Sequence, residues 1–248
     1  MRNKILFLGA LVASMTATAQ ESELSVKLNE ALKSDIRTEA ELERDRNRRP
    51  VQTLEFFGIT PDMKVLELIP GGGWYTKLLA PTLRDDGELY VAIGTGRVKS
   101  SLMSLDGMDK INVLEPKVEI SDGEDNLRTI NEFTLAEKGF DAALTFRNMH
   151  NFDAAGRKNV NDAVFKALKK GGIYGIVDHT RRHMEPITSE NRRRADPVTI
   201  IKELLDSGFV FEGYSNLHRK PDDELRYEVG RKSVTGNSDR FTLLFKKP

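Results

Sequence analysis

The sequence contains no cysteine among its 248 residues. This absence excludes a disulfide framework, catalysis by a cysteine nucleophile and a lipid anchor attached to cysteine. The chain also has no net charge, because 38 basic residues balance 38 acidic ones, so its composition predicts binding neither to nucleic acid nor to an anionic membrane. With 39% hydrophobic and 31% charged residues, the chain has the composition of one soluble domain with a substantial core.

The N-terminal apolar run is too short for a membrane span. It covers residues 5–13, well below the ~20 residues that a transmembrane helix needs. Arg2 and Lys4 precede it, and the small-x-small triplet Ala17-Thr18-Ala19 follows it, which is the pattern of a cleavable secretory signal. We therefore predict a signal peptide over residues 1–19, no stable membrane anchor, and a periplasmic or secreted protein.

Helical spacing of leucine and isoleucine predicts an amphipathic helix from about Glu23 to Arg44. Pro50 suits the first turn of another helix. We accordingly predict a helical extension over residues 20–50 and one domain over residues 51–248.

Within that domain, apolar strands alternate with helices. The predicted strands cover residues 63–69, 87–94, 117–121, 140–146 and 173–179, and the predicted helices cover residues 73–83, 156–170 and 196–209. Gly171 and Gly172 are expected to end the second of these helices. The pattern predicts an α/β fold with a Rossmann-like, doubly wound, mostly parallel seven-stranded sheet. Residues 209–217 and 240–248 are expected to add a C-terminal antiparallel hairpin.

Ligands of parallel α/β sheets bind at the carboxyl ends of the strands. The residues expected there are Glu67, Pro70 to Trp74, Gly94 to Gly96, Ser121 and Asp122, Arg147 to His150, and Asp178 and His179.

The glycine-rich turn at residues 71–73 is the first candidate binding element. Three glycines let a ligand approach the backbone, and the amides that open a helix favour anionic or carboxylate groups. A dinucleotide fingerprint would need a third glycine at Thr76 and an acid about 20 residues further on, so NAD is disfavoured. Because the residue before a proline favours extended backbone, we expect Ile69 to prolong the preceding strand.

From about Arg44 to its end, the chain resembles class I S-adenosylmethionine-dependent methyltransferases, and more narrowly a group of exported methyltransferase-like bacterial proteins. The blocks that carry the resemblance are RDRNRRP, PGGGWYTKLLAP, FRNMHNFD, VDHT and DPVTIIKELLDSGF. The resemblance implies S-adenosyl-L-methionine as cofactor, with Glu67 and the glycine turn near its amino-acid and sugar portions and Asp122 accepting from its adenine. The cofactor site predicted in this way comprises Glu67, Pro70, Gly71, Gly72, Gly73, Trp74, Gly94, Asp122 and Asn148.

The chain departs from the family pattern at two positions. Ile69 stands where the loop usually has its first glycine, and Gly94 or Thr95 stands where an acid usually binds the ribose hydroxyls. A carboxylate makes charge-assisted bonds of roughly 1.5–3 kcal/mol each to such hydroxyls. Its loss predicts weaker binding unless Asp106, Asp109 or water compensates.

His150, Asp178 and His179 are the predicted catalytic residues. A neutral imidazole can take a proton from a hydroxyl or amine, and a carboxylate can orient that imidazole. Together with His183 these residues are also of types that bind zinc or iron. However, the adjacent Asp178 and His179 point to opposite faces of a strand, so no metal site is predicted.

Two further features allow more than one interpretation. The arginines between Arg181 and Arg194 could pair with an anionic small-molecule substrate, although most charge runs are solvated faces. Within this basic segment, Arg194 and Asp196 are the residues for which we expect a specific role. Trp74 and Tyr75 could cover a ligand or pack in the core.

The leading functional hypothesis is a methyltransferase acting on a small molecule or on a periplasmic group. A second hypothesis is a binding protein that retains the fold without using S-adenosylmethionine, because the ribose acid is absent and the cofactor is made in the cytoplasm. A third is a lyase or hydrolase built on His150, Asp178 and His179. A dinucleotide oxidoreductase is least supported, and the sequence does not predict the oligomeric state.

Overall fold

A computed structural model describes residues 21–248 of the chain. The predicted signal peptide, residues 1–19, lies outside the described residues. Among the described helices, none is long and apolar enough to cross a bilayer.

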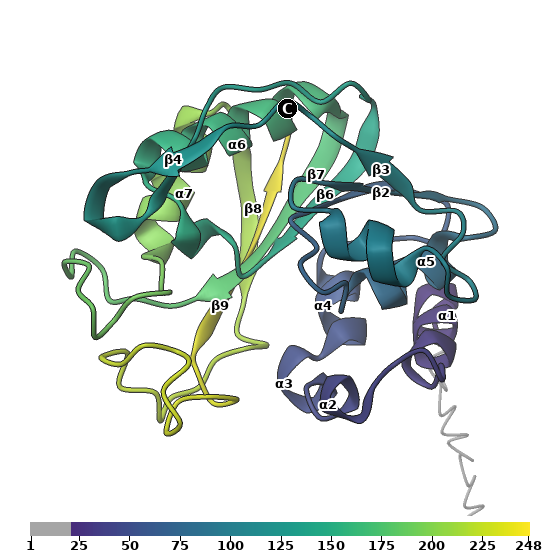
Figure 1. The fold of residues 1–248 in the computed structure, drawn as a ribbon, viewed down its shortest axis with the longest axis horizontal. Helices are drawn as coiled ribbons and strands as arrows, with labels where there is room; N and C mark the ends of the chain where they lie inside the picture. Colours follow the sequence, from purple (N-terminus) through teal and green to yellow (C-terminus); the bar gives the residue numbers. More distant parts are fainter. Residues whose placement is uncertain (1–20) are drawn as a thin grey trace, which may run out of the picture.

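The centre of the molecule is a seven-stranded sheet with the order β3-β2-β1-β6-β7-β9-β8 (Figure 1). Strands β3, β2, β1, β6 and β7 are parallel, and β9 inserts antiparallel between β7 and β8. This arrangement confirms the predicted mostly parallel sheet and its C-terminal antiparallel hairpin. The strands are β1 Lys64–Leu68, β2 Glu88–Ala92, β3 Asn112–Leu114, β6 Phe140–Phe146, β7 Leu168–His179, β8 Val210–Ser215 and β9 Arg240–Lys246.

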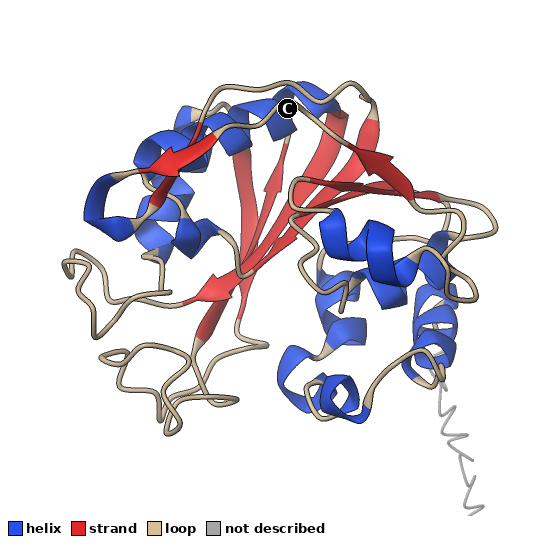
Figure 2. Ribbon diagram, viewed as in Figure 1, coloured by secondary structure: helices blue, strands red, loops and turns tan. Residues whose placement is uncertain are grey.

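Helices cover both faces of this sheet (Figure 2). One layer contains α1, α4 and α5, and the other contains α6 and α7. Successive residues of β1 point to opposite faces, so that Val65 packs under the first layer and Leu66 under the second. The helices are α1 Glu23–Leu32, α2 Glu39–Leu42, α3 Asp45–Arg48, α4 Pro50–Phe56, α5 Thr76–Leu83, α6 Ala154–Ala167 and α7 Pro197–Asp206.

The N-terminal segment differs from the single helix predicted over residues 23–44. Helix α1 ends at Leu32, and two single-turn helices, α2 and α3, follow it. Thr38 and Glu41 form a capping box at the start of α2, which begins a new helix instead of continuing the old one. The predicted helix start at Pro50 is confirmed.

Two predicted boundaries in the main domain are wrong. The third strand of the sheet is β3, residues 112–114, and Pro116 follows it closely without a backbone N–H to continue the ladder. Residues 117–121 instead lead into a separate antiparallel hairpin of β4 Ile120–Asp122 and β5 Arg128–Ile130. Helix α6 ends at Ala167, before the predicted glycine stop, because Leu168 is extended and pairs with Phe140.

Candidate active site at the carboxyl edge of the sheet

Backbone strain marks the carboxyl ends of three neighbouring strands. Ile69 follows β1 with φ 53°, Ile93 follows β2 with φ 64°, and Arg147 follows β6 with φ 65°. Side chains, above all β-branched ones, disfavour this left-handed region, and such strain concentrates at functional sites. The expectation that Ile69 prolongs β1 is therefore wrong: Ile69 adopts the turn geometry that a glycine usually provides.

The three loop glycines have different surroundings. A Cβ on Gly71 or Gly72 would have no heavy atom within 4 Å, whereas a Cβ on Gly73 would overlap Cδ1 of Leu102. Leu102 belongs to the single π-helical turn η1, Val98–Leu102. Internal packing thus explains Gly73, while Gly71 and Gly72 leave open space in which a ligand can approach the backbone.

The loop offers its backbone, and the Trp74 side chain faces elsewhere. Gly73 N–H donates to the Pro70 carbonyl at 2.9 Å, and the amides of Gly71 and Gly72 have no acceptor within residues 21–248. The Trp74 indole donates to the Glu41 carbonyl at 3.0 Å, and its ring is buried. The core interpretation of Trp74 is the one that the structure supports, so only its backbone remains for ligand contact.

Glu67 and Asn148 form hydrogen bonds with residues on either side of the glycine turn. Burial raises the pKa of the fully buried Glu67 carboxyl to about 7, although Thr76 Oγ1 donates to it at 2.6 Å. Asn148 donates to the carbonyls of Leu68 and Ile69 at 3.2 and 3.3 Å. Glu67 thus contacts the first residue of α5, and Asn148 contacts the two residues before Pro70, so both support the ends of the loop.

Three arginines, Arg48, Arg147 and Arg240, lie close together and give this edge a positive character. Arg48 is 6% exposed, and its guanidinium lies over the Trp74 ring at 4.2 Å without a hydrogen bond to any described residue. Burial, and then the charge of Arg147, lowers the pKa of Arg48 to about 9 and that of Arg240 to about 10. Arg240 donates to the Asn47 carbonyl at 3.1 Å. Such groups favour an anion such as a carboxylate.

The ribose and adenine end of the predicted cofactor site has fewer polar partners. Gly94 has φ 64° and is exposed, and Thr95 is buried. Asp109 pairs with Arg84 just beyond the far end of α5, so it does not replace the missing acid.

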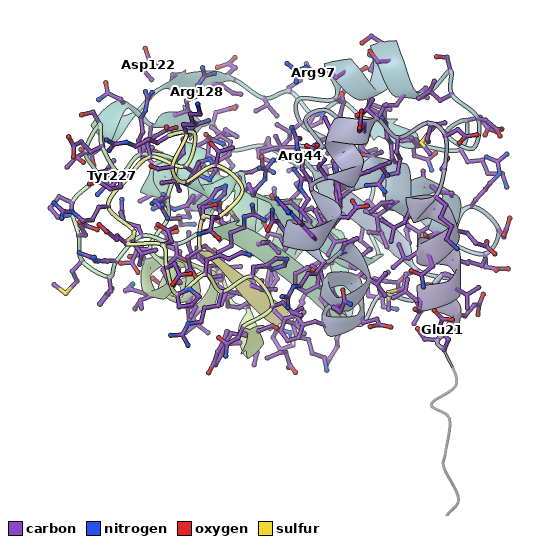
Figure 3. All side chains as sticks on the ribbon, turned by 90° about the horizontal axis from the view of Figure 1, so that it is seen from below. Glu21, Arg44, Arg97, Asp122, Arg128 and Tyr227 are labelled. Atoms are coloured by element: carbon purple, nitrogen blue, oxygen red, sulfur yellow. The ribbon has the colours of Figure 1, made fainter. Side chains whose placement is uncertain are left out.

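Asp122 does not follow the third sheet strand, as predicted, but lies exposed on β4. Figure 3 shows it well apart from Arg97, which follows the turn after β2. The first acid after β3 is Glu115, which pairs with Lys99 at 2.7 Å. Contact of Asp122 with adenine stays a prediction.

The predicted catalytic residues do come together. His150 lies on the turn η3, Met149–Asn151, and its Nδ1 is 2.5 Å from Asp178 Oδ1, while its backbone N–H donates to Asp178 Oδ2 at 3.1 Å. With Nδ1–H donating to the Asp178 carboxylate, Nε2 of His150 is left as a proton acceptor. General-base catalysis uses an imidazole oriented by a carboxylate in this way.

His179 is close to this dyad but is held separately. Its ring centroid is 5.8 Å from that of His150, and its Nδ1 is 2.9 Å from Ser238 Oγ. Burial, followed by the charge of Arg240, lowers the pKa of His179 well below its ordinary value. His179 is thus a neutral neighbour of the His150–Asp178 pair. Within the described residues, no group of three or more candidate ligands could hold a metal ion.

A polar cavity of about 260 Å³ opens beside the dyad. His150 lines it, together with the β4–β5 hairpin, the start of α6 and the segment after β7. Arg194 is buried and donates to Asp223 at 3.0 Å, and Asp196 caps α7 by accepting from Val198 at 2.9 Å. Both residues thus have structural contacts, and the expected role beyond a structural one stays a prediction.

Structural comparison relates this fold to methyltransferases. The chain is similar to an S-adenosylmethionine-dependent methyltransferase from Aquifex aeolicus, with 15% identity, a TM-score of 0.57 and coverage of 90% of this chain and 98% of the other. It is similar to the glycopeptide N-methyltransferase MtfA at 16% identity and TM-score 0.55, with 82% and 91% covered. The [4+2]-cyclase SpnF matches at 13% identity and TM-score 0.53, with 91% and 93% covered. No protein-family model matches the sequence, and a search of curated proteins found no match.

These similarities establish the fold of class I S-adenosylmethionine-dependent methyltransferases. They do not define the reaction, because a protein named as a cyclase shares the fold.

Proposed function

We propose that the protein is an S-adenosylmethionine-dependent methyltransferase that acts on a small acceptor and uses His150 as general base. The proposal rests on the position of the turn η3 and of Asn148, the residue that precedes it. Asn148 donates to the carbonyls of Leu68 and Ile69, where the chain enters the glycine loop, and two residues later His150 lines the polar cavity with its Nδ1 held by Asp178. One short segment thereby links a cofactor loop to an acceptor cavity.

The loop suits the amino-acid end of S-adenosylmethionine. Gly71 and Gly72 leave space for it, their amides lack acceptors among the described residues, and Arg48 supplies a counter-charge for a carboxylate. The ribose end would rest on Gly94 and Thr95 without a carboxylate, which supports weak binding. When bound, the cofactor supplies an electrophilic methyl group.

The chain's own residues supply the remaining chemistry. Nε2 of His150 takes the proton of an acceptor hydroxyl or amine, and Asp178 stabilises the resulting imidazolium. The cavity orients the acceptor toward that nitrogen. We further propose that the signal sequence directs the protein to the periplasm or the exterior, where the acceptor is a small molecule or a periplasmic group.

Thermal unfolding of residues 20–248 with S-adenosylmethionine or S-adenosylhomocysteine tests the proposal. A ligand at 100 times its Kd stabilises by ~2.7 kcal/mol, and we expect both compounds to raise Tm and NAD to leave it unchanged. Gly72→Val should abolish the increase. Unchanged Tm with both adenosyl compounds at millimolar concentration would contradict the proposal and favour another ligand on the same fold.

A further inference from the structure

The cavity beside His150 contains two charged side chains without partners. Arg181 and Glu185 both line it, and neither forms a hydrogen bond or ion pair with a described residue through its side chain. Two guanidinium nitrogens of Arg181, Nε and Nη1, and one carboxylate oxygen of Glu185, Oε2, are also shielded from solvent. Both residues are half-buried, and shielding charged atoms without a hydrogen-bond partner is unfavourable, so a ligand that pairs with them would stabilise this arrangement.

Four other charged residues of the cavity have hydrogen-bond partners within the protein. Arg157 donates to Glu203 at 2.7 Å, and Asp153 caps α6 by accepting from Gly156 at 2.7 Å. Arg194 and Asp196 have the partners described above. Asp125, on the hairpin turn, is exposed and adds a second acid at the edge of the cavity. The half-buried charged groups without a hydrogen-bond partner among the described residues are thus one cation and one acid, and the exposed Asp125 lies near them.

We infer that this cavity is the acceptor subsite and that it selects a small zwitterion, with Arg181 binding an anionic group and Glu185 an ammonium group. Calling the cavity an acceptor subsite rests on the proposed function, whereas the binding of a zwitterion there does not depend on it. A free amino acid is the simplest molecule of this class. The cavity volume of about 260 Å³ lies just below the ~300–1,000 Å³ of pockets that bind drug-sized molecules, so the cavity suits a ligand as small as an amino acid.

Arg181 and Glu185 belong to the same short segment, and hydrogen bonds hold its backbone in place. Arg181 N–H donates to the Ala195 carbonyl at 2.8 Å, and Glu185 N–H donates to the Arg182 carbonyl at 3.2 Å. His150, carried by η3, lines the same cavity. A zwitterion bound by Arg181 and Glu185 would therefore share this cavity with the proposed base.

The test measures binding without cofactor. Proteinogenic amino acids are examined one at a time by ligand-observed NMR and calorimetry with residues 20–248, each beside its decarboxylated amine and its des-amino acid. We expect at least one amino acid to bind and both truncated analogues to bind more weakly. Arg181→Gln and Glu185→Gln should each weaken binding of that amino acid roughly tenfold or more, because each removes a charge-assisted bond.

Two matched variants serve as controls. Arg182 and Glu190 are exposed and lie outside the cavity lining, so Arg182→Gln and Glu190→Gln should leave affinity unchanged. The Tm of Arg181→Gln and Glu185→Gln should stay level or rise, whereas a merely structural role would lower it. The inference is overturned if no amino acid binds, or if the two cavity variants bind as well as the wild type. Binding of an amino acid without any methyl transfer would instead contradict the proposed function alone.

Discussion

Asp178 fixes the imidazole of His150 through two hydrogen bonds, one to the ring and one to the backbone. Replacing the base should remove proton transfer, an effect that is typically 10²–10⁴-fold. We expect His150→Gln to lower the rate of methyl transfer by roughly that factor, and Asp178→Asn to lower it less. The measurement is the single-turnover rate with the acceptor found in the binding screen.

The control for this prediction is Ser238→Ala, which removes the hydroxyl beside His179 and leaves the dyad intact. Its rate should stay within a few-fold of the wild type. Equal losses in the Ser238 and His150 variants would contradict the assignment of His150 as base. Retained adenosyl-ligand binding in both variants would show that only the chemical step has changed.

The raised pKa of the buried Glu67 carboxyl predicts that the free energy of unfolding falls as pH rises toward neutrality. Its pKa is raised by burial to about 7 from 4.5, so the folded state holds this proton more tightly than the unfolded state does. The contribution to stability is present below pH 4.5 and is lost as pH rises through 7. Between pH 4.5 and 8 we expect the wild type to lose on the order of 3 kcal/mol of its free energy of unfolding through this group, and Glu67→Gln not to show this loss. Urea unfolding of both proteins across that range measures the difference. The same slope in wild type and variant would be the contrary result.

Single residues of the site were predictable where chemistry and strand position coincide. His150 and Asp178 follow recognisable strands, so their meeting at one edge could be expected from the sequence. Arg147 and Arg240 were not recognised as partners of Arg48, because their cluster joins a strand end, the start of β9 and an N-terminal helix. No spacing rule connects positions so far apart in the chain.

At the scale of elements, the loop after β1 serves both packing and ligand access, at different glycines. Ala at position 73 would overlap Leu102 and occupy a left-handed φ of 76°. We expect Gly73→Ala to lower the free energy of unfolding by about 2–4 kcal/mol. Gly72→Ala meets nothing within 4 Å and should change it by about 0.5 kcal/mol or less.

A double-mutant cycle separates these contributions. Leu102→Ala removes the overlapping methyl groups, so the destabilisation of Gly73→Ala measured in that background should be smaller. Chemical unfolding of the four proteins gives the coupling. Strictly additive effects would show that Leu102 is not what requires glycine at position 73.

Long, strongly patterned elements were predicted well, whereas short ones were not. The apolar runs of β1, β2 and β6 and the periodicity of α7 agree with the structure to within a few residues. Strand β3 has only three residues, so the longer alternating stretch over residues 117–121, which leads into β4, was assigned in its place. That error moved Asp122 into a role that its exposed hairpin position does not explain.

At the scale of the whole molecule, the N-terminal helices are tied to the C-terminal half across the carboxyl edge. His218 Nε2 donates to the Arg48 carbonyl at 2.8 Å, and His218 Nδ1 is 2.7 Å from Thr242 Oγ1. Arg240 reaches the Asn47 carbonyl in the same region. The sequence predicted a helical extension but not this closure, since the contacts depend on buried backbone carbonyls that carry no residue signature.

This closure should make the molecule sensitive to acid. Burial lowers the pKa of His218 to about 4 from 6.5, so the unfolded state binds its proton first. The contribution to stability is therefore present above pH 6.5 and is lost as pH falls through 4, with a magnitude on the order of 3 kcal/mol. His218→Gln keeps an amide donor for the Arg48 carbonyl and an oxygen for Thr242, but it cannot titrate. We expect its stability to decline less than that of the wild type between pH 6.5 and 4. Thermal unfolding of both proteins across this range measures the difference, and parallel pH profiles would show that protonation of His218 does not open the closure.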